Sequence, residues 1–233
     1  MSDDPTKPNQ DFLNSLMPEG PTDPAEEPDN WGDAYTAQGK EYMEKGDYPK
    51  AQDQFKRALE SKLEEGGEAQ PAIGEIYSYL ARVHSYLGEH EQALELYEKS
   101  LEVLKNSVGE DHIFLGDVYN ALGNSLRQLQ RNDEAIKAMK QGLEITLKSA
   151  GTDHPSVGVG CNNLANVLRD LGQKDEALLY YERALSSLSQ SLGTDHAFVQ
   201  RTMVNFFDLA AELKGVSPEQ LVAEMQAEIE KPS

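Results

Sequence analysis

Apolar residues recur at steps of three and four positions from Trp31 onward, which is the spacing of an amphipathic helix. The first such stripe consists of Ala34, Tyr35, Gly39 and Tyr42. Residues 46–49 end this helix and open a second one, which we predict at about 50–64. Its inward positions are Ala51, Phe55, Ala58 and Leu59. The pattern predicts a helix pair that must stack on neighbouring pairs to bury its apolar stripe.

A unit of 42 residues is repeated along the chain without insertions. The motif Gly-x-Asp-His marks its register at 109–112, 151–154 and 193–196, and Gly67-Glu68 holds the same register upstream. A fixed period of this size is typical of stacked structural repeats. The function of such a chain is expected to depend on an extended surface.

Four inward positions align through four consecutive units, and small residues occupy two of them. The first helix carries Tyr35, Tyr77, Tyr119 and Cys161 at one position and Gly39, Ala81, Gly123 and Ala165 at the next. The second helix carries Ala51, Ala93, Ala135 and Ala177, followed by Phe55, Tyr97, Met139 and Tyr181. Small residues recur where two helix axes approach closely, because a larger side chain would push them apart.

These offsets resemble the tetratricopeptide repeat over roughly residues 32–214. The resemblance implies an all-α, right-handed solenoid of about five helix-turn-helix units with a C-terminal capping helix. The usual repeat has about 34 residues, whereas the longer unit here is similar to the repeats of kinesin light chains. Residues 151–155 and 162–165 carry that similarity.

Three regions follow from this organisation. Residues 1–30 contain six prolines and eight acidic residues against Lys7 alone, a composition that predicts a disordered tail. The solenoid spans 31–215, with repeats near 32–73, 74–115, 116–157 and 158–199 and a partial one at 200–215. Residues 216–233 form the capping helix and its tail. There Ser217-Pro218-Glu219-Gln220 predicts a capping box, and Glu219 replaces the small residue of the repeat.

Charge and composition exclude several classes of function. The net charge of −20 makes nucleic acid an unfavourable partner. No apolar run is long enough to cross a bilayer, and no secretory signal opens the chain, so we predict a cytoplasmic protein without a membrane partner. The single cysteine, Cys161, agrees with a reducing compartment.

The sequence positions of the residues that could carry chemistry indicate structural roles for them. His112, His154 and His196 recur at one repeat position, but repeats stack roughly 10 Å apart, which is too far for a shared metal ion. We predict that the repeated pair of Asp and His caps helices, with a short acceptor side chain satisfying free backbone N–H groups. Cys161 occupies a buried aromatic site, and no phosphate loop or nucleophile elbow is present. We therefore predict no enzyme activity, no cofactor and no metal.

Polar side chains on the first helices are the candidate binding residues. They lie beside the buried stripe, where they should line the concave face. The predicted peptide-binding groove consists of Lys40, Arg82, Asn120, Asn124, Arg127, Asn162, Asn166, Arg169, Arg201 and Asn205. An Asn amide can both donate to and accept from a peptide backbone, and Arg can hold carboxylates. The alternative is an ordinary solvated polar face.

The sequence predicts a noncatalytic interaction module, or adaptor, that binds a peptide segment of a partner protein in this groove. A self-assembling structural scaffold and a regulatory subunit of an enzyme remain as alternatives. The apolar motif at 11–17, inside the acidic tail, is either a remnant of apolar residues or a docking segment. The kinesin light chain resemblance implies the second, because that family has an acidic segment that occupies its repeats.

Overall fold

The computed structural model describes residues 30–66 and 70–229, and this part of the chain is built from helices and short turns without strands. The docking motif predicted at 11–17 lies outside the described residues. Ten helices are present in the described part: α2 (Trp31–Glu44), α3 (Tyr48–Gly66), α4 (Pro71–Tyr86), α5 (His90–Val108), α6 (Ile113–Gln128), α7 (Asn132–Ala150), α8 (Pro155–Asp170), α9 (Lys174–Leu192), α10 (Ala197–Lys214) and α11 (Pro218–Ile229).

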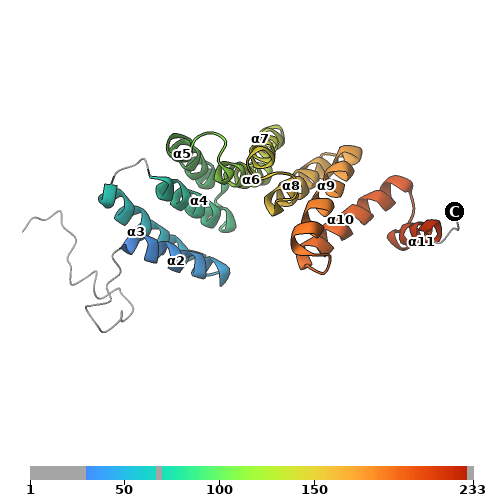
Figure 1. Cartoon of the computed structure of the whole chain (residues 1–233), viewed down its shortest axis with the longest axis horizontal. Coiled ribbons are helices and arrows are strands. Elements are labelled where there is room, and N and C mark those ends of the chain that lie inside the picture. The colour runs from blue at the N-terminus through green and yellow to red at the C-terminus, as the bar shows by residue number, and fades with distance from the viewer. Residues whose placement is uncertain (1–29, 67–69, 230–233) are drawn as a thin grey trace, which may run out of the picture.

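Consecutive helices form pairs, and the pairs stack side by side into the predicted right-handed solenoid (Figure 1). The pairs are α2–α3, α4–α5, α6–α7 and α8–α9, while α10 begins a fifth unit. Among the described helices, none is both long enough and apolar enough to span a membrane.

Glycines allow the two helices of a pair to approach each other closely. A Cβ added to Gly116 on α6 would lie 2.9 Å from the carbonyl oxygen of Gly142 on α7, and one added to Gly142 would lie 2.7 Å from the carbonyl oxygen of Gly116. In the first pair, a Cβ at Gly39 would meet the Phe55 ring at 2.6 Å. The prediction that small residues mark close helix crossings is confirmed.

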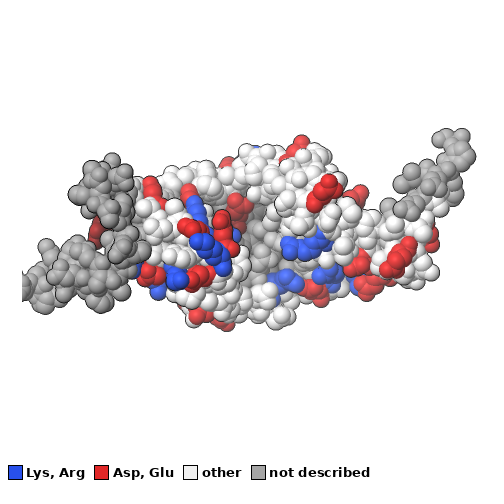
Figure 2. Space-filling view, turned by 90° about the horizontal axis from the view of Figure 1, so that it is seen from below, with Lys and Arg blue, Asp and Glu red and all other residues white. Residues whose placement is uncertain are grey.

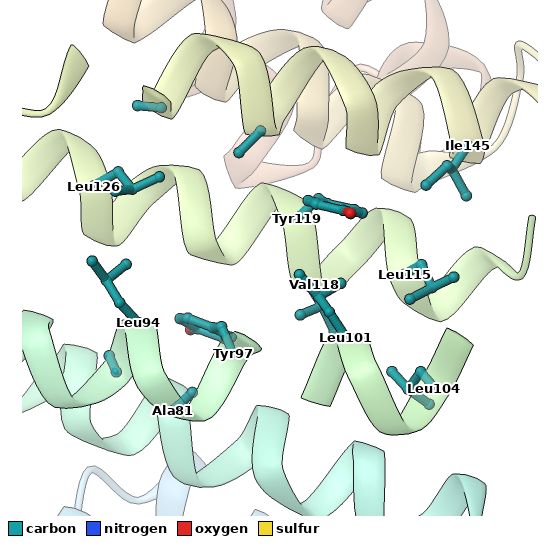
Figure 3. Packing of buried hydrophobic residues seen from close by; sticks show 13 residues of the cluster. Ala81, Leu94, Tyr97, Leu101, Leu104, Leu115, Val118, Tyr119, Leu126 and Ile145 are labelled. Atoms are coloured by element: carbon teal, nitrogen blue, oxygen red, sulfur yellow. The ribbon is translucent and has the colours of Figure 1, made fainter. Parts of the chain in front are cut away.

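Large side chains then fill the space beside each crossing and run without a break from one pair to the next (Figure 3). Tyr97 and Leu104 from α5 face Leu115 and Val118 from α6, and all four are less than 4% exposed. Full burial of such a side chain contributes about 1.5–3 kcal/mol. Because neighbouring pairs share these contacts, the interface with the next repeat adds to the stability that each pair has from its own packing.

The histidine of the Gly-x-Asp-His motif, rather than the aspartate, caps the following helix. Nδ1 of His112, His154 and His196 accepts the backbone N–H of the residue two positions on, over 3.4, 3.2 and 3.2 Å. The prediction that the pair caps the helix is confirmed for its histidine, whereas the aspartate lies one residue too early to reach these groups. Asp111 instead forms an ion pair with Lys148, 2.6 Å away on α7.

The last helix, α11, begins with the predicted capping box. The backbone N–H of Gln220 donates to Oγ of Ser217 over 3.2 Å, and the N–H of Ser217 donates to Oε1 of Gln220 over 3.0 Å. Leu221 is buried against the end of the solenoid. However, α11 contacts α10 far less extensively than α9 contacts α8, so the end of the solenoid is only partly covered.

Candidate functional site: the concave face

The first helices of the pairs line the concave side of the solenoid. Beyond the contacts within pairs, α2 contacts α4, α4 contacts α6, and α6 contacts α8, whereas no contact of similar extent joins the second helices in the described part. Figure 2 views the molecule from below relative to Figure 1. Lys and Arg side chains gather on both sides of a recess near the middle of this face, with Asp and Glu side chains beside them.

A hollow of about 560 Å³ opens between α4, α6 and α8. Its lining is mixed, because Tyr86, Ala121 and Val159 add apolar surface to the polar side chains of Arg82, Asp117, Asn120, Asn124, Gln128 and Asn163. Its floor contains the hydroxyls of Ser85 and Ser125, which lie 2.8 Å apart. Three of the predicted groove residues, Arg82, Asn120 and Asn124, thus meet at one place.

The asparagines differ in how far they are already used within the chain. Asn120 accepts a hydrogen bond from Nδ2 of Asn163 over 3.2 Å, and Asn166 accepts one from the Tyr181 hydroxyl over 2.6 Å. The half-buried side chain of Asn124 lines the hollow and makes no hydrogen bond to another described residue. Its amide therefore has both a donor and an acceptor to offer.

Asn162 does not belong to the groove. Its side chain is 4% exposed and accepts a hydrogen bond from Oγ1 of the buried Thr202 over 3.2 Å, at the interface between α8 and α10. The prediction that Asn162 lines the concave face is wrong. One residue corresponds to about 100° of rotation around a helix, so the next residue, Asn163, faces the hollow instead.

The two central arginines are held by groups of the chain itself. Nε of Arg127 donates to Oδ2 of Asp170 over 2.9 Å, and Nη2 of Arg127 contacts the same oxygen. Nη1 of Arg169 donates to Oδ1 of Asn205 over 3.5 Å, while Nε of Arg169 lies 3.9 Å from Asp170. The single carboxylate of Asp170 thus balances part of the positive charge in this half of the groove.

At the N-terminal half of the groove, two cations lie over one aromatic ring. Nζ of Lys40 is 4.7 Å from the centre of the Tyr79 ring, and Cζ of Arg82 is 5.9 Å from it. Among the described residues, no carboxylate is within ion-pair distance of either cation. Arg201, at the other end, lies over the Phe198 ring at 5.0 Å.

Asp117 keeps the hollow from being uniformly basic. Burial raises the pKa of its carboxyl, while hydrogen bonding to Ser156 and the nearby charge of Arg82 oppose that rise. A ligand in the hollow therefore meets acceptors as well as cations.

Sequence reasoning missed several residues that shape the hollow. The Tyr79 ring contacts the cations of Lys40 and Arg82. Ser85, Ser125 and Asn163 complete the lining of the hollow. The 42-residue alignment does not pair Ser85 with Ser125, which are 40 residues apart and meet only because the two first helices stack. Arg82 lies three residues after Tyr79 on α4, a spacing that brings side chains together on a helix, whereas the contact of Lys40 with this ring depends on how α2 and α4 stack.

The other residues considered for chemistry are structural. Cys161 is 2% exposed, and burial raises the pKa of its thiol to about 11. In the described part of the chain, no three His, Cys, Asp or Glu side chains gather closely enough to hold a metal ion.

Stacked helix pairs with a concave face of amides, hydroxyls and cations define an α-solenoid of the protein-interaction class. Residues 30–106 and 114–190 match the family model of the tetratricopeptide repeat, and the chain belongs to that family. No curated protein sequence matches it significantly.

Several solved structures share the fold at low sequence identity. BtubC (BKLC) from P. vanneervenii has a TM-score of 0.70 and 22% identity, covering 87% of this chain and 84% of its own. A putative kinesin light chain from Podospora anserina, with nearly identical TPR-like repeats, has a TM-score of 0.66 and 16% identity, covering 88% of this chain and 100% of its own. PilF from Pseudomonas aeruginosa has a TM-score of 0.61 and 21% identity, covering 88% and 79%.

Proposed function

We propose that this protein is a noncatalytic adaptor that binds an extended or short helical segment of a partner protein in its concave groove. The observation that carries the proposal is the hollow between α4, α6 and α8. The free amide of Asn124 and the side chain of Arg82 both line this hollow. The tetratricopeptide repeat is a protein-interaction fold, which agrees with this role. We place the adaptor in the cytoplasm, in keeping with its single free cysteine.

The chemistry of the groove favours a ligand with an acidic group near one end. Lys40 and Arg82 have no carboxylate partner among the described residues, and the Tyr79 ring orients both. A carboxylate of the ligand would supply the missing partner and gain charge-assisted hydrogen bonds from Arg82. The peptide backbone would then continue across Asn124, whose amide can pair with one C=O and one N–H.

The experiment begins with selection of 12-residue peptides displayed on phage against the immobilised full-length chain. Affinities of the selected peptides are then measured by calorimetry for the wild type, Asn124→Ala and Arg82→Ala. Loss of one amide hydrogen bond, about 0.5–1.5 kcal/mol, should weaken binding about 2- to 12-fold. Arg82→Ala should weaken acidic peptides most at low salt.

Matched controls lie on the outer helix α5. Asn106 and Lys99 are both exposed there, so Asn106→Ala removes an amide and Lys99→Ala removes a positive charge from a different face. These controls should bind like the wild type. If they weaken binding while the groove variants do not, the partner binds the outer helices and the groove proposal is wrong.

The proposal includes an intramolecular ligand, the apolar motif at 11–17 inside the acidic tail, which would compete with the partner for the groove. Its carboxylate and apolar residues suit Arg82 and the walls of the hollow. Amide NMR spectra of the repeats should differ with and without residues 1–30, and salt should reduce the difference. Identical spectra would exclude self-docking while leaving binding of an external partner to be measured separately.

A further inference from the structure

A second cleft, apart from the concave hollow, opens at the C-terminal end of the solenoid between α10 and α11. It has a volume of about 870 Å³. Met203, Val204 and Phe207 from α10 and Val222 from α11 form its apolar surface. Val204 is 57% exposed and Val222 is 37% exposed. Such a continuous exposed apolar surface is typical of an interaction site.

The repeat register explains why this surface is open. Met203 and Phe207 lie 42 residues after Cys161 and Ala165, which are 2% and 0% exposed in the preceding unit. There, α9 packs along the whole of α8. In the fifth unit α11 has 12 residues, against 19 in each earlier second helix, and contacts only part of α10, so α10 lacks a full-length second helix. The element that would complete this packing is a helix.

The charges around the cleft are all of one sign. Asp195, Asp208 and Glu219 line it, and no Lys, Arg or His does so among the described residues. An acidic rim around an apolar floor complements an amphipathic helix with basic residues beside its apolar face.

We propose that this cleft docks a basic amphipathic helix of a partner protein, which takes the place of the missing full-length second helix of the fifth unit. Charge argues against the other occupants. A second copy of the chain carries a net charge of −20, and the N-terminal segment 1–30 has eight acidic residues against Lys7 alone. Both would bring negative charge to a negative rim.

The test uses two synthetic 18-residue helical peptides that share a leucine stripe at i, i+3, i+4 and i+7. One has Lys beside the stripe and the other has Glu. Fluorescence anisotropy with the full chain should show binding of the Lys peptide, at least about tenfold weaker binding of the Glu peptide, and weakening by salt.

Variants locate the site. Val204→Asp puts a charge into the apolar floor and should weaken the Lys peptide about tenfold or more. Leu179→Asp is the matched control, because Leu179 on α9 is 58% exposed and lies outside the cleft. The affinity of Leu179→Asp for the Lys peptide should be within about twofold of the wild-type affinity. Asp208→Asn should weaken binding and flatten its dependence on salt, and circular dichroism confirms that each variant is folded.

Three results would overturn the proposal. Equal binding by Val204→Asp and Leu179→Asp would show that the peptide binds another acidic surface. Equal binding of the Lys and Glu peptides would remove the charge complementarity. A concentration-dependent dimer in light scattering that Val204→Asp abolishes would make a second copy the occupant.

Discussion

Arg127 on α6 and Asp170 on α8 form an ion pair that bridges two neighbouring repeats, with Nε of Arg127 2.9 Å from Oδ2 of Asp170. The pair lies partly exposed in the concave face, where an ion pair contributes about 0–1 kcal/mol to stability. Its larger effect is on recognition, because it removes a cation from the part of the groove that a ligand would contact.

We therefore expect Asp170→Asn to strengthen binding of an acidic groove peptide by freeing Arg127, with a change of less than about 1 kcal/mol in the free energy of unfolding. Calorimetry at two salt concentrations and a urea titration measure the two effects. Glu182→Gln on the exposed side of α9 removes one negative charge elsewhere and serves as the control. Equal affinities for the two variants would mean that only net charge matters.

Two glycines in helix interiors should respond in opposite ways to alanine. At Gly142 the new Cβ would lie 2.7 Å from a backbone oxygen of α6, so Gly142→Ala should destabilise the protein by about 1–3 kcal/mol. At Gly160 the Cβ would meet only Leu143, at an ordinary 3.6 Å, so Gly160→Ala should stabilise α8 by about 0.5–1 kcal/mol. Urea midpoints of the two variants measure this contrast, and a loss of stability in both would contradict it.

The turn between α6 and α7 should be improved by a glycine. Gln130 has φ of 60°, whereas the equivalent turn positions are Gly46, Gly88 and Gly172, with φ of 74°, 80° and 76°. The left-handed conformation costs a residue with a Cβ about 1–2 kcal/mol, partly offset by the greater entropy that glycine has when unfolded. Gln130→Gly should raise the melting temperature slightly, while Gln130→Ala, which keeps the Cβ, should not.

The capping role of histidine can be separated from that of its neighbour. His196→Ala removes the acceptor for the backbone N–H of Phe198 and should cost about 0.5–2 kcal/mol, whereas His196→Asn keeps an acceptor and should cost less. Asp195→Ala should have little effect. Hydrogen exchange of the Phe198 amide and thermal melting measure the difference, and an equal loss in Asp195→Ala would restore the aspartate as the cap.

Alkaline pH should destabilise the fold through its buried weak acids. Burial raises the pKa of Cys161 from its ordinary value of 9.0 to about 11 and that of Tyr97 from 10.0 to about 12. The unfolded chain releases these protons first, so stability is intact below about pH 9 and falls as pH rises toward 11. For Cys161 the loss is about 2–3 kcal/mol.

Urea unfolding of the wild type and Cys161→Ala at pH 8 and pH 10.5 measures the effect of Cys161. The stability of Cys161→Ala should depend less on pH between these values. The native thiol should also react with a thiol reagent at pH 8 only at the rate of local unfolding. Rapid labelling of the folded protein would contradict the assigned burial.

The sequence was most informative where a residue's role repeats with the period of the helix. The aligned small positions such as Gly39 and Gly123, and the bulky partners Phe55 and Met139, identified the paired helices and their crossings. Groove residues were harder to assign, because a residue at the edge of the buried stripe can fall on either side of it. Asn162 and Asn163 are such a case, and the buried Thr202 on the next repeat decided between them.

By itself, the sequence determined the class of fold, the units and the close crossings, because these depend on local spacing and on side-chain volume repeated every 42 residues. Only the tertiary structure decided which groove charges are already balanced, since Arg127 meets Asp170 across a repeat boundary 43 positions away. It alone placed Lys40 of α2 over the Tyr79 ring of α4 and left α10 only partly covered by α11. Such contacts depend on the angle at which one helix pair stacks on the next, and that angle is set by the whole packed interface rather than by any local pattern.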